Sequence, residues 1–219
     1  MFTSRSGTES PHGLLAPQGA RTAAFAASGA MAVTLLVASS VPLPPLSRHM
    51  ALHIVLMSVV GPLLALALSR QFESLGSGRW RLALPSLVQL AVLWAWHIPA
   101  ALATAHQSHA AQVSMHATLL ASAVWFWSAV IAQVRSERWR SIAALLITGK
   151  LFCLLGALLT FAPRELYLIP ALHGPEHGTS LEDQQLAGLL MLAACPATYV
   201  VAGVALTVRW LDELARDER

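Results

Sequence analysis

The residues of this chain with the clearest chemical potential begin at His49. His49, His53 and Met57 recur at i, i+4 and i+8, so on a helix two imidazoles and one thioether share a face. They lie at the start of an apolar run, Met50 to Ser69, that is long enough to cross a membrane. Imidazole and thioether together suit copper, Cu(I) in particular, whereas an all-oxygen set would suit Mg²⁺ or Ca²⁺. The stretch is a candidate metal site.

Further histidines lie at a similar depth in other apolar runs. His97 lies near the end of the run 82–103, and His116 lies near the start of the run 110–132. At helical rise, the rings of His53, His97 and His116 would start roughly 5 to 9 Å below one membrane boundary. Ionisable groups inside a span usually face the bundle interior and mark a site. We therefore expect these three to be the principal ligands, supplemented by Met57 and Met191 at a similar depth and by His49 and His109 above them. His49, His106 and His109 lie in the predicted outer loops, above the layer.

A second group of polar residues surrounds the loop 163–185. It comprises His173, His177, Glu182, Asp183 and Gln184, which we expect to lie above the histidine layer. Taken singly, a histidine at a membrane interface is most often an amphipathic side chain at the headgroup level, and a methionine is most often a packing residue. The functional interpretation therefore depends on the shared depth of these side chains.

The elements that position these residues follow from composition. Hydrophobic residues make up 56% of the chain and charged residues 11%, and the mean hydropathy is +0.59. These values are far from those of a soluble domain and indicate a polytopic membrane protein in a lipid bilayer. The basic pI of about 9.4 comes from loop arginines, and the pattern excludes a nucleic-acid-binding module.

Six apolar runs of 20 to 23 residues predict six spans. Because lipid offers backbone groups no water, and the runs lack period-2 alternation, they must be helices. We predict an all-α bundle with a disordered tail over 1–21, a transmembrane domain over 22–210 and a second tail over 211–219. The predicted spans are about 22–41, 50–69, 82–103, 110–132, 142–162 and 186–208.

Orientation follows from the arginines on alternate sides of these spans. Eleven lie on the side of the termini and two, Arg48 and Arg164, on the other. Positive residues favour the cytoplasmic side, so both termini should be cytoplasmic and the histidine-rich loops should face outward. The eleven are Arg5, Arg21, Arg70, Arg79, Arg81, Arg135, Arg138, Arg140, Arg209, Arg216 and Arg219.

Several motifs together resemble the CtaG family of cytochrome c oxidase assembly factors, of the multi-span type. The resemblance covers about residues 45 to 210, and the Leu-Glu-Asp-Gln-Gln-Leu-Ala-Gly element is its most specific part. The motifs are His49-Met50-x-x-His53, Trp94-Ala-Trp96-His97-Ile-Pro99, the His109 to His116 pair with Phe126-Trp127, Leu158-Leu-Thr160-Phe161-Ala-Pro163-Arg164 with Tyr167, and Leu181 to Met191.

The resemblance implies a non-enzymatic role in maturing haem-copper oxidase in the bacterial cytoplasmic membrane, with oxidase subunits as partners and copper supplied to the catalytic subunit. Two alternatives remain open from the residues. One is a membrane hydrolase with three histidines on zinc and Asp183 or Glu182 activating a water. The other is an electron carrier with two histidines as axial haem ligands.

Overall fold

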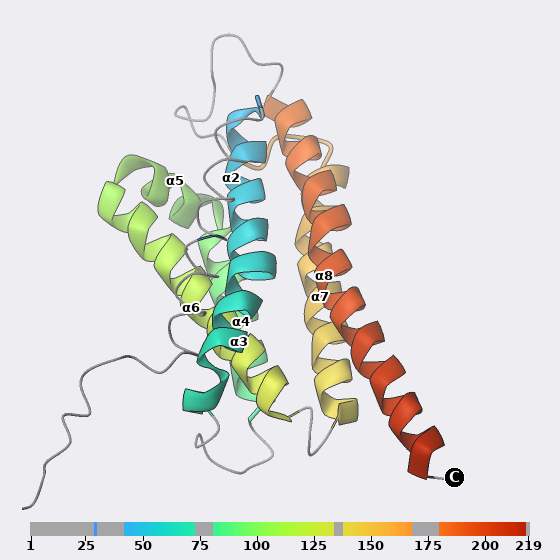
Figure 1. Ribbon diagram of the computed structural model, residues 1–219. Helices are drawn as coiled ribbons and strands as arrows, with labels where there is room; N and C mark the ends of the chain where they lie inside the picture. The colour runs from blue at the N-terminus through green and yellow to red at the C-terminus, as the bar shows by residue number, and fades with distance from the viewer. Residues whose placement is uncertain (1–28, 30–41, 73–80, 134–137, 168–179, 218–219) are drawn as a thin grey trace, which may run out of the picture.

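The computed structural model describes residues 29, 42–72, 81–133, 138–167 and 180–217, and every described element is helical (Figure 1). This confirms the predicted all-α class. The predicted first span, 22–41, and the tail over 1–21 lie outside the described residues, apart from residue 29. The elements are α2 (Pro45–Val55), a π-helical turn η1 (Leu56–Val60), α3 (Gly61–Phe72), α4 (Ala83–Trp96), α5 (Pro99–Gln107), α6 (His109–Gln133), α7 (Arg138–Phe161) and α8 (Ser180–Asp217).

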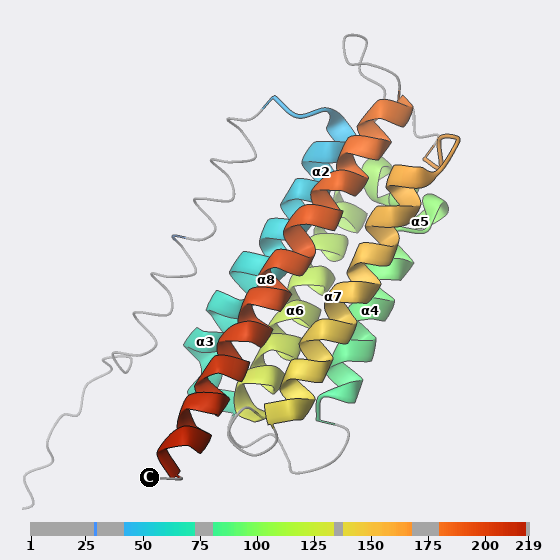
Figure 2. The same cartoon turned by 90° about the vertical axis from the view of Figure 1, so that its right-hand side faces the viewer.

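Several helical segments are long and apolar enough to cross a membrane. Four qualify within the described residues: Pro45–Leu68, His109–Gln133, Arg138–Phe161 and Leu181–Arg216. The bent pair α4 and α5 makes a fifth if it counts as one span. The protein is thus a multi-pass helical membrane bundle. In Figures 1 and 2, α2 begins, α7 ends and α8 begins at one end of this bundle, which we call the histidine end.

The predicted span 82–103 is not one straight helix. It divides into α4 and α5, which meet at an angle of 72°. Proline explains the break: the residue before a proline avoids the helical region, and Ile98 has φ −64° and ψ 132°. Pro99 then starts α5 at the first helical position, where its missing N–H does no harm. His97, the last residue before the break, therefore sits at a bend rather than within a helical turn.

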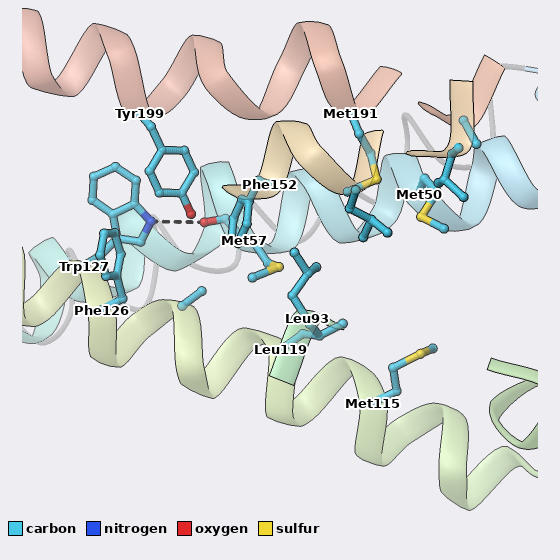
Figure 3. Close-up of a cluster of buried hydrophobic side chains, with 14 of the residues drawn as sticks. Met50, Met57, Leu93, Met115, Leu119, Phe126, Trp127, Phe152, Met191 and Tyr199 are labelled. Atoms are coloured by element: carbon cyan, nitrogen blue, oxygen red, sulfur yellow. Dashed lines mark hydrogen bonds between the residues drawn. The ribbon is translucent and has the colours of Figure 1, made fainter. Parts of the chain in front are cut away.

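A second irregularity lies just before Pro62, where the helix forms the π-helical turn. The N–H of Gly61 bonds to the carbonyl of Leu56, five residues back. In the same pattern the carbonyl of Met57 would pair with residue 62, but proline has no N–H. The indole Nε1 of Trp127 fills this gap by donating to the Met57 carbonyl over 3.1 Å (Figure 3). The tryptophan thus stabilises the irregular turn.

A close contact between α7 and α8 sets the position of the last helix. A Cβ atom on Gly188 would lie 2.6 Å from the carbonyl oxygen of Gly156, so only glycine fits. Figure 2 shows α8 running beside α7 on one side and beside α2 on the other. Deeper in the bundle, Gln89 of α4 donates to the hydroxyl of the fully buried Tyr199 of α8 over 2.9 Å. These contacts hold α8 against α7 and α4, on the side of α8 that faces the bundle, and leave it running beside α2.

Candidate metal centre

Five histidines from four helical segments gather at the histidine end. The rings of His49 and His53, one turn apart on α2, have centroids 4.2 Å apart. His53 lies 5.4 Å from the ring of His97 and 5.3 Å from that of His116. His106 of α5 lies 4.9 Å from His49. The bend at Pro99 turns α5 back across the bundle, which brings His106 to the same layer as the other four rings.

Three of these histidines have ligand nitrogens within 4.8 Å of one another: His49, His53 and His116. A metal bound by imidazoles at about 2 Å requires donor atoms separated by roughly 3 to 4 Å, so small side-chain shifts would close this set around one ion. His53 is 2% exposed and His49 7%. The arrangement is buried, nitrogen-rich and nearly pre-formed.

Five imidazole nitrogens in this layer are buried and lack a hydrogen-bond partner. Buried polar atoms without a partner are rare and destabilising, and they call for an explanation such as a ligand. Several unpartnered buried atoms occur elsewhere in the described bundle, but these are hydroxyl or amide oxygens that do not gather in one place comparable to the histidine layer. In the histidine layer they gather on adjacent rings: Nε2 of His49, His106 and His116, and both nitrogens of His53.

His97 is oriented by its own backbone. Its Nδ1 lies 2.7 Å from the carbonyl oxygen of Leu93, and because a carbonyl can only accept, Nδ1 carries the proton. Nε2 therefore presents a lone pair, and it lies 3.2 Å from the sulfur of Met50. A thioether sulfur has no proton to donate, so two electron-pair donors face each other here.

The other predicted ligands lie at varied distances from this layer. His109 is exposed at the first residue of α6. Met57 and Met191 are buried in the hydrophobic cluster drawn in Figure 3. The π-helical turn starts at Leu56, so the i, i+8 register that linked Met57 to His49 is interrupted. His173 and His177 lie outside the described residues, and the assignment of metal ligands stays a prediction.

Asp183 caps the first turn of α2. Its carboxylate accepts hydrogen bonds of 2.8 Å from the backbone N–H groups of Leu46 and Ser47 and one of 2.6 Å from the Ser47 hydroxyl. These N–H groups lie in the first turn of α2, where they have no helical partner, and Pro44 at the cap position has no side-chain acceptor. The negative charge also opposes the positive end of the helix dipole. Asp183 therefore fixes the helix that carries His49 and His53.

Gln184 and Tyr167 support the other side of the layer. The Gln184 amide accepts from the backbone N–H of Leu166 over 2.6 Å and donates to the carbonyls of Leu159 and Arg164. This holds the segment after α7, from which the Tyr167 hydroxyl donates to the carbonyl of His97 over 2.8 Å. Burial raises the pKa of the Tyr167 hydroxyl, so it stays a donor. Glu182, the neighbour of Asp183, is exposed.

Sequence reasoning missed two residues of this layer, His106 and Met50. A straight span over 82–103 would place His106 in the loop above the layer, where an interfacial role is the ordinary one. The Ile98-Pro99 pair could have indicated the bend. Met50 shares the helix of the predicted ligands, but its partner His97 comes from α4, and no spacing along one helix reveals such a contact.

Comparison with known proteins assigns the chain to a family. No curated protein and no solved structure matches it. The family model of the cytochrome c oxidase caa3 assembly factors, however, matches residues 8–213, most of the chain and the whole histidine layer. The chain therefore belongs to the family of cytochrome c oxidase caa3 assembly factors.

Proposed function

We propose that this assembly factor holds copper as its cargo in the histidine layer and supports its delivery to the catalytic subunit of the oxidase. The observation that carries the proposal is the group of unpartnered, buried imidazole nitrogens on His49, His53 and His116. A bound ion would satisfy these nitrogens together. The family membership indicates a non-catalytic role in oxidase assembly, and copper is a metal that a haem-copper oxidase must receive.

The donor set favours copper in its reduced form. Imidazole suits copper and zinc alike, whereas thioether sulfur selects soft Cu(I). The layer adds buried methionine sulfur to its imidazoles, and the Asp183 carboxylate is engaged with the first turn of α2. An uncharged site of nitrogen and sulfur in apolar surroundings stabilises a monovalent soft cation better than a hard divalent one.

The two alternatives are less well supported. A zinc hydrolase would need a free carboxylate beside its metal-bound water, but both Asp183 oxygens accept hydrogen bonds from α2 and Glu182 is exposed. A haem with two axial histidines needs a slot for the porphyrin plane between the rings. Here the rings pack edge to face, with centroids 4.2 to 5.4 Å apart, which leaves no such slot.

We place the protein in the bacterial cytoplasmic membrane with the histidine end outward. The arginine asymmetry supports this orientation. It would put the cargo within reach of an oxidase subunit that takes up copper from the outer side. The outer-loop histidines His173 and His177 would then capture copper before it enters the layer.

Metal binding tests the proposal directly. Full-length protein in detergent, loaded anaerobically with Cu(I) and desalted, should retain stoichiometric copper by elemental analysis. His53→Ala should abolish this retention, because the ring of His53 contacts three other imidazoles of the layer. Gln107→Ala is the control: it changes an exposed residue at the end of α5, next to the layer, and should bind copper like the wild type. Equal retention by the His53→Ala protein would overturn the proposal.

In cells, a His53→Ala, His116→Ala double variant should leave cytochrome c oxidase present but poorly active. Added copper should restore part of the activity if delivery is the limiting step. Immunoblotting of membranes would first establish that the variant inserts normally. Full oxidase activity with normal insertion would remove the histidine layer as the working site and leave a scaffolding role.

The orientation has its own test. In a background with Cys153 and Cys195 replaced by Ser, single cysteines at Ala110→Cys and Arg216→Cys lie at opposite ends of the bundle, and both native residues are exposed. An impermeant maleimide added to intact cells should label position 110 and leave position 216 unlabelled until the membrane is opened. The reverse pattern would place the histidine end in the cytoplasm.

A further inference from the structure

Two side chains at the edge of the histidine layer, Met50 and His97, are not part of the set formed by His49, His53 and His116. Met50 is fully buried and His97 is 4% exposed. Met50 Sδ and His97 Nε2 lie 3.2 Å apart and come from α2 and the end of α4. Because Nδ1–H of His97 donates to Leu93, neither facing atom can donate a hydrogen bond to the other.

From this juxtaposition we propose a second, sulfur-containing Cu(I) position beside the three-histidine position, with Met50 Sδ and His97 Nε2 as ligands and His53 as the third donor. The inference rests on the proposed copper cargo function and adds to it the ligand Met50. Nothing in the i, i+4, i+8 pattern of the sequence indicated this residue.

The separation of the two donors sets the coordination number. With metal–nitrogen and metal–sulfur bonds of about 2.0 and 2.3 Å, a donor separation of 3.2 Å corresponds to an angle of roughly 95° at the metal. This angle excludes a linear two-ligand site and requires at least one further donor. His53 is the available one: its ring lies 5.4 Å from that of His97, and both of its nitrogens are unpartnered.

His53 also belongs to the three-histidine set, so it borders both positions. An ion can then pass from nitrogen-only to sulfur-containing coordination by exchanging ligands around one imidazole, without leaving the buried layer. The two positions differ in their donor atoms, because only the second includes a soft thioether sulfur. Cu(I) should use both, whereas Zn²⁺, which prefers imidazole over thioether, should stay at the three histidines.

The test compares Met50→Leu with Met115→Leu. Both swaps nearly conserve volume at fully buried sites and should cost little stability. Met115 is not a ligand of either proposed position. X-ray absorption of Cu(I)-loaded wild-type protein and of the Met115→Leu protein should include copper–sulfur scattering, which the Met50→Leu protein should lack.

The same variants should separate the two metals. Met50→Leu should weaken Cu(I) binding about tenfold, a loss of about 1.4 kcal/mol, and leave Zn²⁺ affinity unchanged. Nitrogen-only coordination in the wild type, with Cu(I) affinity equal in the Met50→Leu protein, would overturn the second position and leave the three-histidine position standing. A protein that retains no copper at all would overturn both proposals.

Discussion

The histidine layer and the π-helical turn lie close together along the same membrane segment, and both depart from regular apolar helix. At the turn, the carbonyl that proline leaves free receives the indole N–H of Trp127. In the layer, Asp183, Gln184 and Tyr167 satisfy the backbone groups around the histidines, yet five imidazole nitrogens stay unpartnered. The chain itself thus satisfies the irregular backbone in both regions, whereas the group of unpartnered imidazole nitrogens is the observation on which the proposed copper site rests.

The largest effect on copper binding is expected from a substitution of Asp183. Asp183→Ala removes the acceptor for two N–H groups and one hydroxyl in the first turn of α2. Because residues that orient metal ligands matter nearly as much as the ligands, Cu(I) affinity should fall roughly 10- to 100-fold. Competition with a Cu(I) chelator measures the effect. Glu182→Ala, at the exposed neighbour, is the control, and wild-type affinity in Asp183→Ala would show that the cap does not position the histidines.

A smaller effect is expected at Tyr167. Tyr167→Phe removes only the hydroxyl that donates to the carbonyl of His97, at a cost of about 1 to 3 kcal/mol for a buried group. His97 belongs to the proposed sulfur-containing position, so Cu(I) affinity should fall by less than about tenfold. Thermal unfolding in detergent, measured beside chelator competition, separates the two effects. An unchanged Cu(I) affinity would assign Tyr167 to stability alone.

The smallest effect on copper is expected at the π-helical turn. Trp127→Phe keeps an aromatic ring but leaves the Met57 carbonyl without its donor, so the protein should lose about 1 to 3 kcal/mol of stability. Copper stoichiometry and Cu(I) affinity should not change, because the Trp127 indole donates to the backbone carbonyl of Met57 in this turn and neither proposed copper position includes Trp127. Loss of copper binding in a Trp127→Phe protein that is still folded would mean that the two regions are coupled and would contradict the contrast between them.

The sequence predicted the helical class, and its apolar runs 50–69, 110–132 and 142–162 lie within or largely within the segments that form α2 with α3, α6 and α7. α8 extends beyond the predicted run 186–208 at both ends and continues into the predicted tail 211–219. Long apolar runs admit few other structures in lipid. The sequence also predicted that His53, His97 and His116 share a level, because depth in a membrane follows from helical rise alone. The structure brings the ring of His53 close to both other rings.

Other features depend on contacts between helices. The role of Asp183 requires α8 to begin beside the proline-capped start of α2, and the Met50–His97 pair requires α4 to end against α2. Neither is encoded in the spacing of one segment. The Ile98-Pro99 pair indicates the bend that brings His106 to the layer. The direction of this bend depends on how α5 packs against α6.

The cap that Asp183 places on α2 also has a consequence for timing. The carboxylate and the N–H groups it holds are separated by 137 and 136 residues. Because chains are synthesised from the N-terminus onward, the first turn of α2 gains this cap only after α8 has been made. All five histidines of the layer are therefore synthesised before the residue that fixes the helix of His49 and His53, and the proposed copper site would become pre-organised only once α8 has packed beside α2.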